Sequence, residues 1–171
     1  MSGSNRVRSQ RILREADGYL ELGLPQQALN SLARMREPAT FKGQKLYLTG
    51  EAFRAMQRYS EASDALEESA DLSPSNIHVW LALGWCYKRT GRLEQAISAL
   101  ERAHEIAPQE PIIYYNLACY YSLNAQKQRA LNYLSQALAM QPDYRDMIGE
   151  ERDFDPLRSD PDFQALTSII V

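Results

Sequence analysis

One pattern of small, aromatic and apolar residues recurs along this chain at a fixed period. It is most complete in residues 77–110, with the sequence IHVWLALGWCYKRTGRLEQAISALERAHEIAPQE, and it returns in residues 43–76 and 111–144. A more divergent copy occupies residues 9–42. Copies of equal length that follow one another directly, as these do, are typical of tandem repeats. In such proteins each copy is one structural unit that buries its apolar surface by stacking on the next.

The copy at residues 77–110 predicts two helices that fold back on each other. One face of the first helix carries Trp80, Leu83, Gly84 and Tyr87. One face of the second helix carries Ala96, Leu100 and Ala103. Gly91 follows the first helix, where a residue with positive φ can close the turn. Pro108 ends the second helix because proline cannot continue the hydrogen-bond ladder. Gly84 and Ala96 are expected to face each other where the two helices cross. The distance between the helix axes can then be at the short end of the usual range of about 8–10 Å.

These residues resemble the tetratricopeptide repeat family over residues 9–144, about four fifths of the chain. The resemblance implies an all-α fold: an α-solenoid of antiparallel helix hairpins, the tetratricopeptide repeat superhelix, with about four repeats and a C-terminal cap, as in small bacterial arrays. In the first copy, Glu15 replaces an apolar residue and Pro38 comes two residues early. Both departures suit an end repeat that has one face in water.

The predicted organisation follows from this register. It comprises a flexible N-terminus at 1–8, a divergent repeat 1 at 9–42, repeat 2 at 43–76, repeat 3 at 77–110, repeat 4 at 111–144 and C-terminal capping helices at 145–171.

The tail, residues 145–171, leaves the repeat pattern. Asp160-Pro161-Asp162 predicts a helix start, with an N-cap acceptor, a proline in the first turn and an acid favoured by the helix dipole. The apolar residues that share one side of this helix are Phe163, Leu166, Ile169 and Ile170. The run DFDPLRSDPDFQAL also resembles segments that follow the last repeat in many bacterial tetratricopeptide proteins. We expect a cap on repeat 4; the alternative is that the apolar end, SIIV, inserts into the groove of a neighbouring molecule.

The sequence predicts no enzyme and no cofactor or metal site. His78 and His104 are the only histidines, and neither has a serine or cysteine arranged as a nucleophile. There is no glycine-rich phosphate loop. The acidic residues of the tail lack the regular alternation and the turn glycine of a calcium loop.

In the family, the first helices of successive repeats line a concave groove that binds peptides. The resemblance assigns this peptide-binding groove to Tyr47, Arg54, Leu81, Trp85, Lys88, Arg89, Ile112, Tyr115, Asn116 and Cys119. Its aromatic and apolar members form a strip that a soluble protein needs a reason to expose. Trp85 is the most informative, because it is not a packing position and tryptophan often anchors interfaces. Arg54, Lys88 and Arg89 are expected to pair with an acidic side chain or a terminal carboxylate. The alternative is that the tail or the next repeat covers Trp85.

The partner is therefore expected to be a protein or peptide. The acidic tail of heat-shock chaperones, the best-known ligand of the family, is disfavoured: the positions that would hold the Lys, Asn and Arg clamp carry Tyr47, Glu51, Ala82, Ile112 and Asn116. The competing hypothesis is a self-assembling structural protein. It rests on the apolar tail and on the uneven charge, with ten basic and five acidic residues in 1–60 but nine and seventeen in 61–171.

Nucleic acid and membranes are not expected as partners. A pI near 5.5 argues against a phosphate-binding surface, and no apolar run approaches the ~20 residues that span a bilayer. Two cysteines without metal or redox spacing fit a reducing, cytoplasmic location.

Overall fold

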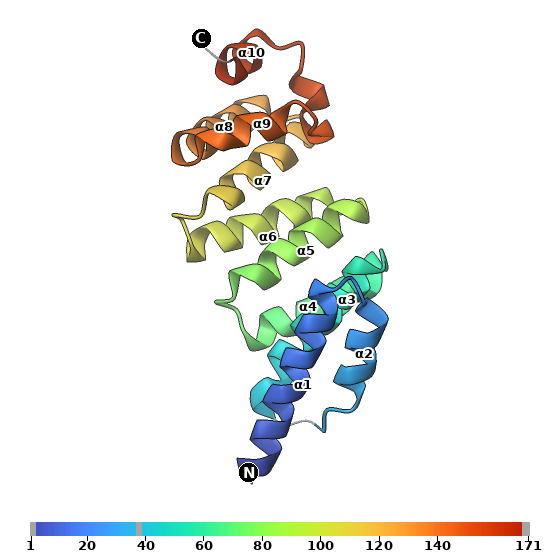
Figure 1. Ribbon diagram of the computed structural model, residues 1–171. Helices are drawn as coiled ribbons and strands as arrows, with labels where there is room; N and C mark the ends of the chain where they lie inside the picture. The colour runs from blue at the N-terminus through green and yellow to red at the C-terminus, as the bar shows by residue number, and fades with distance from the viewer. Residues whose placement is uncertain (1–2, 37–38, 169–171) are drawn as a thin grey trace. The chain divides into compact units, whose positions relative to one another are not determined.

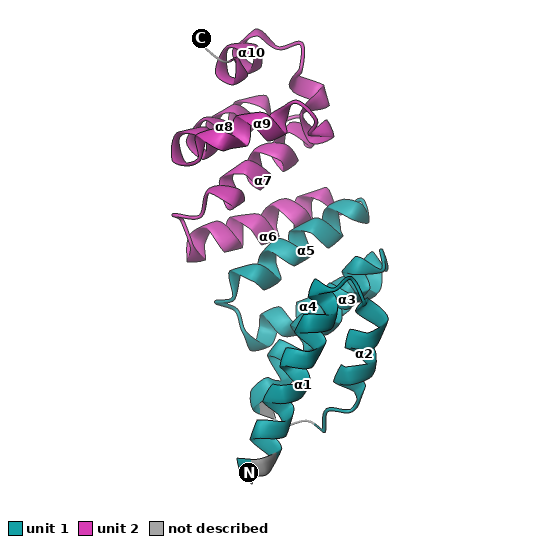
Figure 2. Ribbon diagram, viewed as in Figure 1, with its two compact units in different colours: residues 1–91 teal, residues 92–171 magenta. Residues whose placement is uncertain are grey.

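The computed structural model describes residues 3–36 and 39–168, and in these residues the chain is all-α, as the repeat pattern predicts (Figure 1). The chain divides into two compact units, Met1–Gly91 and Arg92–Val171, which are described separately (Figure 2).

Unit 1 contains two helix hairpins and a fifth long helix. Its elements are α1 (Gly3–Glu21), α2 (Pro25–Ala33), the 3-10 turn η1 (Ala39–Phe41), α3 (Lys42–Ala55), α4 (Tyr59–Leu72) and α5 (Ile77–Arg89). Helix α1 packs on α2, α3 packs on α4, and α4 packs on α5. The first helix begins at Gly3. Residues 3–8, which the sequence predicts to be a flexible N-terminus, are part of this helix.

Glu15, the polar residue at an apolar repeat position in the first hairpin, is bonded to side chains at the end of the hairpin's second helix. The Ser31 hydroxyl of α2 donates a hydrogen bond of 2.9 Å to the Glu15 carboxylate, and Arg34 forms an ion pair with the same carboxylate. Around this pair, α1 and α2 bury an apolar cluster that includes Ile12, Ala16 and Leu32. A polar pair at the edge of an apolar core thus stands where repeats 3 and 4 have Leu83 and Leu117.

The small residues allow the two helices of a hairpin to approach closely. A Cβ atom added at Gly50 of α3 would lie 2.5 Å from Leu66 Cγ and 3.3 Å from the Ala62 carbonyl oxygen, both on α4. Leu66 and Ala62 are fully buried, so neither has room to retreat. Gly50 and Ala62 occupy the same repeat positions in repeat 2 as Gly84 and Ala96 in repeat 3.

The turn after the first helix of each repeat has the same left-handed backbone. Gly91, after α5, has φ of 76°, which confirms the predicted turn, and Gly23, after α1, has φ of 70°. Gln57 and Ala125, at the same repeat position after α3 and α7, have φ of 59° and 55°. The backbone geometry is therefore kept at all four turns although only two of them have glycine.

Unit 2 contains one long helix, one hairpin and the tail. Its elements are α6 (Leu93–Ile106), α7 (Pro111–Leu123), α8 (Lys127–Met140), η2 (Pro142–Tyr144), α9 (Arg145–Ile148), η3 (Arg152–Leu157) and α10 (Pro161–Thr167). Helix α7 packs on α6 and α8, η3 packs on α7, and α10 packs on α8. The tail buries Ile148, Phe154, Leu157 and Phe163 in this contact.

Helix α10 begins as the sequence predicts. The Asp160 carboxylate accepts hydrogen bonds from the backbone N–H groups of Asp162 and Phe163, at 2.9 and 3.2 Å. Lys127 Nζ of α8 lies 2.6 Å from the Asp160 carboxylate and 2.9 Å from that of Asp162, which ties α10 to α8. The alternative role of SIIV concerns Ile169 to Val171, which lie outside the described residues.

In each unit, one aromatic side chain binds the loop that precedes its helix. Trp80 Nε1 donates a hydrogen bond of 2.9 Å to the Pro74 carbonyl oxygen. In unit 2 the Tyr114 hydroxyl donates one of 2.7 Å to the Pro108 carbonyl oxygen. Both bonds reach back six positions along the chain, to the proline that follows the preceding helix.

Candidate functional site

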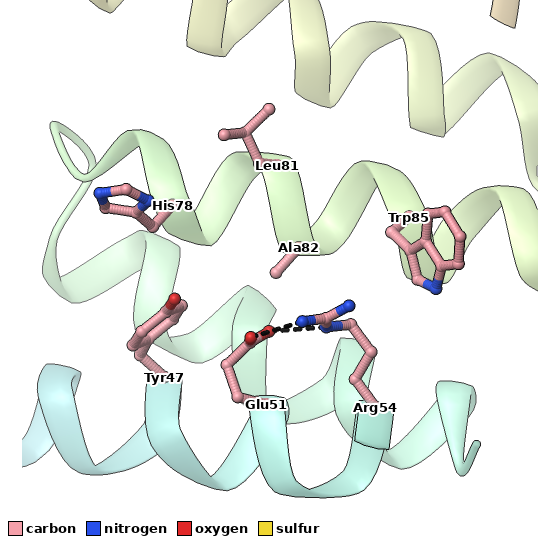
Figure 3. Close-up of a pocket in the computed structure, with 7 residues that line it drawn as sticks. All are labelled: Tyr47, Glu51, Arg54, His78, Leu81, Ala82 and Trp85. Carbon is pink, nitrogen blue, oxygen red and sulfur yellow. Dashed lines mark hydrogen bonds and ion pairs between the residues drawn. The ribbon is translucent and has the colours of Figure 1, made fainter. Parts of the chain in front are cut away.

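Helices α3 and α5 of unit 1 enclose a pocket of about 240 Å³. It is lined by Tyr47, Glu51 and Arg54 from α3 and by His78, Leu81, Ala82 and Trp85 from α5 (Figure 3). The three lining residues of α3 are three or four positions apart, so they share one face of that helix. Four residues of the predicted groove, Tyr47, Arg54, Leu81 and Trp85, are thus brought together.

Trp85 presents the largest exposed apolar surface of this pocket, with 40% of the residue accessible. Lys88 Nζ lies 5.0 Å from the centre of its ring, within the range of a cation–π contact. Trp80, earlier on α5, is less exposed, and its indole N–H is already bonded to Pro74. The two tryptophans therefore differ in role: Trp80 fixes the helix, and Trp85 offers an open aromatic surface.

Arg54 is paired within the pocket. Its Nε and Nη2 donate hydrogen bonds of 2.8 and 2.7 Å to the two carboxylate oxygens of Glu51. The hydrogen bonds to Glu51 raise the pKa of the Arg54 guanidinium. The charge of Arg54 is thus balanced inside the site by an acidic side chain of the same helix.

Tyr47 contributes a neutral polar group. Burial raises the pKa of its hydroxyl to about 12, and the negative charge of Glu51 adds to the effect. The hydroxyl is therefore protonated at neutral pH and can donate one hydrogen bond and accept others.

Arg89 lies outside the pocket. Its guanidinium lies over the ring of Tyr59 on α4, 5.2 Å from the ring centre. Neither Arg89 nor Lys88 lines the pocket.

The remaining four residues of the predicted groove, Ile112, Tyr115, Asn116 and Cys119, lie on α7 of unit 2. Tyr115 and Cys119 are each 2% exposed. The Tyr115 ring makes edge contacts with Tyr144 of η2 and with Phe154 of the tail, at 5.2 and 5.7 Å between ring centres. The expectation that Tyr115 and Cys119 are open to a ligand is therefore corrected: the tail covers them. Ile112 and Asn116 are half-buried.

Glu51, His78 and Ala82 line the pocket but were not among the predicted site residues. Their spacing provides a signal, because Glu51 follows Tyr47 by one helical turn and His78 precedes Trp85 by two. The pairing of Glu51 with Arg54 cannot be read from spacing alone, since an arginine one turn away can also point to water.

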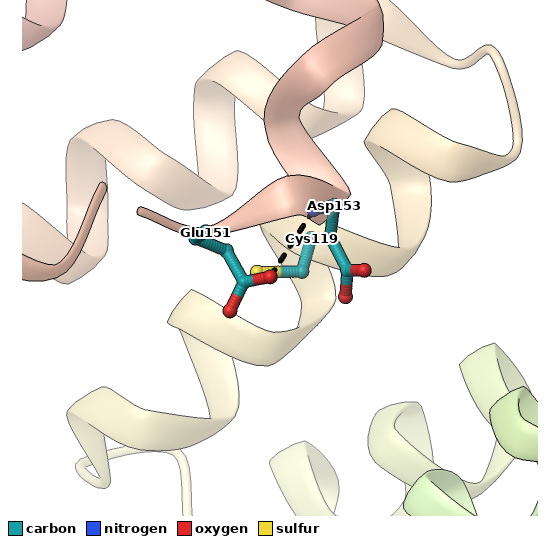
Figure 4. A group of neighbouring side chains, drawn as sticks. All are labelled: Cys119, Glu151 and Asp153. Atoms are coloured by element: carbon teal, nitrogen blue, oxygen red, sulfur yellow. Dashed lines mark hydrogen bonds between the residues drawn. The ribbon is translucent and has the colours of Figure 1, made fainter. Parts of the chain in front are cut away.

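One group of side chains in the described part of the chain could hold a metal ion. The Cys119 sulfur and one carboxylate oxygen each of Glu151 and Asp153 lie within 4.8 Å of one another (Figure 4). These three residues come from two separate segments, so no regular ligand spacing marks them in the sequence. Within the described residues, no helix has both the length and the hydropathy to cross a membrane.

Comparisons with known proteins identify the repeat. Two profiles described as tetratricopeptide repeat match residues 53–118 and 112–144, together more than half of the chain. No curated protein matches the sequence.

Several solved structures are similar to this chain. MamA 41-end from Desulfovibrio magneticus RS-1 is 20% identical, with 93% of each chain covered and a TM-score of 0.74. TTC0263, a thermophilic TPR protein in Thermus thermophilus, is 20% identical, with 92% of this chain and 94% of that chain covered and a TM-score of 0.67. YrrB, a TPR protein with an unusual peptide-binding site, is 19% identical, with 80% of this chain and 71% of that chain covered and a TM-score of 0.69. At these identities the likeness extends to the fold.

Proposed function

This chain belongs to the tetratricopeptide repeat family, and from that premise we propose that it is a non-catalytic protein-interaction module that binds a peptide segment of a partner in the pocket of unit 1. The fold is shared with YrrB, whose structure is described by its peptide-binding site. A pocket between the first helices of two successive repeats is the natural place for such a ligand, because both helices present side chains to it.

The exposed ring of Trp85 is the observation that carries this proposal. Tryptophan supplies a large, rigid apolar surface at low entropic cost, and in interfaces it is enriched among the residues that dominate affinity. Leu81 and Ala82 of the same helix are the other apolar residues that line the pocket beside Trp85 (Figure 3). A ligand side chain that covers Trp85 and Leu81 would remove this surface from water.

The polar groups of the pocket define the rest of the ligand. Arg54 is neutralised by Glu51, which disfavours a strongly acidic segment. The neutral Tyr47 hydroxyl and the exposed imidazole of His78 can bond the N–H and C=O groups of an extended peptide backbone. The proposed ligand is therefore a near-neutral, extended segment with an apolar or aromatic anchor residue.

The pocket also supports a role without catalysis. Its lining residues include no serine, cysteine, threonine or lysine that could act as a nucleophile. Glu51, the only carboxylate among them, is occupied by Arg54. Binding requires none of these chemical groups.

The proposal is tested by selecting peptides from a random displayed library on the purified chain and measuring their affinity by fluorescence anisotropy. Trp85→Ala is expected to weaken the selected peptides at least tenfold, about 1.4 kcal/mol. Leu72→Ala is the matched control, because Leu72 is also an exposed apolar residue of unit 1 but does not line the pocket.

Two results would overturn the proposal. Selection that yields no binder, or binders with equal affinity for both variants, would remove the pocket from consideration. Sedimentation velocity on the same samples separates the competing hypothesis: a concentration-dependent dimer that Trp85→Ala abolishes would reassign this surface to self-assembly.

A further inference from the structure

Cys119, Glu151 and Asp153 meet where the tail crosses α7 in unit 2. Cys119 lies within α7, whereas Glu151 and Asp153 lie at the beginning of η3, beyond α8 and α9 in the chain (Figure 4). The Glu151 carboxylate is oriented by the backbone, since it accepts a hydrogen bond of 3.1 Å from the Asp153 N–H. The fold, and not the sequence spacing, therefore brings one sulfur and two carboxylates together.

The Tyr115 hydroxyl is a second, independent feature of this place. Tyr115 lies one turn before Cys119, is 2% exposed, and its hydroxyl has no hydrogen-bond partner in the described part of the chain. A buried hydroxyl without a partner is destabilising, so such groups are uncommon. Burial raises the pKa of Tyr115 strongly, and Cys119, Glu151 and Asp153 each raise it further. The hydroxyl therefore lies within electrostatic reach of the same three side chains.

Arg158 is a basic side chain near this cluster. Its positive charge lowers the pKa of Tyr115 and so partly offsets the effect of the acidic groups on that pKa. Its hydrogen bonds, however, go to the backbone carbonyls of Ile148 and Glu151, at 3.1 and 2.9 Å, and to the Asp155 carboxylate at 3.0 Å. These bonds direct the guanidinium toward the backbone of the tail and toward Asp155.

We propose that Cys119, Glu151 and Asp153 bind a thiophilic divalent cation such as Zn²⁺. Thiolate sulfur selects zinc-like ions over Mg²⁺ and Ca²⁺, and carboxylate oxygens are common companions. Three protein ligands leave a fourth tetrahedral position for water, to which the hydroxyl of Tyr115, one helical turn before Cys119, would bond. On binding, the Cys119 thiol loses its proton to solvent as the metal–sulfur bond forms.

The geometry requires only a small adjustment. Zinc–sulfur bonds of about 2.3 Å and zinc–oxygen bonds of about 2.0–2.2 Å place tetrahedral ligand atoms roughly 3.5 Å apart. The three atoms now lie within 4.8 Å of one another. Glu151 and Asp153 are half-buried, so side-chain rotation can close the difference. The bound ion would join η3 to α7 and so fasten the tail to its repeat.

The test uses the purified, metal-stripped chain at neutral pH. Titration calorimetry with Zn²⁺ is expected to show one strong site, and Co²⁺ is expected to give the near-ultraviolet charge-transfer band of a thiolate ligand. Cys119→Ala should abolish that band, and Glu151→Gln or Asp153→Asn should weaken Zn²⁺ binding at least tenfold. Tyr115→Phe should keep the band but lower the affinity about tenfold, as expected for a residue outside the ligand set.

Cys86→Ala and Glu150→Gln are the matched controls, because they change the other cysteine and an exposed acid beside the cluster. Both should bind Zn²⁺ like the wild type. Absence of a strong site in the wild-type chain, or a Co²⁺ band that survives Cys119→Ala, would overturn the proposal. A further measurement needs no variant: the thermal midpoint of the wild type should rise with Zn²⁺ and not with Mg²⁺, and no rise would also count against the site.

Discussion

Arg54 and Glu51 bind each other across one turn of α3, through two hydrogen bonds of 2.8 and 2.7 Å between the guanidinium and the two carboxylate oxygens. Both residues line the pocket, so the strongest positive charge in the site is balanced before any ligand arrives. This pairing of the Arg54 and Glu51 charges should decide which peptides the pocket prefers. A single substitution can remove it.

Glu51→Gln should shift the ligand preference toward acidic peptides. Without the Glu51 carboxylate, Arg54 can pair with a ligand carboxylate, so a peptide with Asp beside its anchor should gain about two- to fivefold in affinity over its Asn counterpart. The measurement is fluorescence anisotropy with matched Asp and Asn peptides. Glu61→Gln, which breaks a similar ion pair with Arg58 outside the pocket, is the control. An unchanged Asp-to-Asn ratio in Glu51→Gln would contradict the prediction.

Gly50→Ala should destabilise the hairpin of α3 and α4. The new Cβ would lie 2.5 Å from Leu66 Cγ, and such overpacking typically lowers the free energy of unfolding by about 1–3 kcal/mol. Gly18→Ala in α1 is the opposite case: a Cβ there meets nothing within 4 Å, so better helix propensity should raise stability by about 0.5–1 kcal/mol. Urea denaturation followed by circular dichroism compares the two. Equal effects would mean that the close crossing does not require a small residue.

Ala125→Gly should stabilise the turn between α7 and α8. Ala125 has φ of 55°, a left-handed conformation that costs a residue with a Cβ roughly 1–2 kcal/mol. Removing the Cβ should raise the free energy of unfolding by about 0.5–1 kcal/mol. Ala139→Gly, at an exposed site within α8, should instead lower it by about 0.5–1 kcal/mol. If both variants were destabilised alike in urea melts, the strain at Ala125 would be refuted.

Stability should fall in alkali because of buried tyrosines. Burial raises the pKa of Tyr47 and of Tyr121 to about 12, and the Tyr121 hydroxyl also donates a hydrogen bond to Glu101. In the unfolded chain these hydroxyls ionise near 10. The neutral form is thus favoured by folding, so its contribution is fully present below pH 10 and is lost as the pH rises through about 12.

Urea midpoints measured from neutral pH up to about pH 12 check this prediction. Tyr47→Phe and Tyr121→Phe should each make the alkaline decline shallower, because each removes one hydroxyl whose ionisation opposes folding. The double variant should flatten the decline more than either single variant. A decline with the same slope in all three variants would assign it to other groups.

The features that depend on local spacing were predictable from the sequence. The left-handed turn at Gly91 and the N-cap at Asp160 follow from residue types within one or two turns of helix, and both are present. The close packing at Gly50 also follows, because the period places a small residue at each crossing. These features recur or act over short range, so a single sequence contains enough information to find them.

The way in which the tail folds back over α7 was not predictable. Tyr115 and Cys119 occupy groove positions in the repeat register, but η3 folds back over α7 and covers them. The tail has no period, so nothing in the register indicates where it returns. For the same reason the approach of Glu151 and Asp153 to Cys119 is visible only in three dimensions.

The hydrogen bonds from Trp80 to the Pro74 carbonyl and from Tyr114 to the Pro108 carbonyl restrict how such a chain can change in length. Each bond spans the same short stretch of loop, so a single residue inserted between the proline and the aromatic side chain would pull the donor from its acceptor. An inserted whole repeat would bring its own proline and its own aromatic side chain. The array can therefore gain or lose complete repeats and keep these hydrogen bonds. The gain or loss of a single residue in these loops would break them.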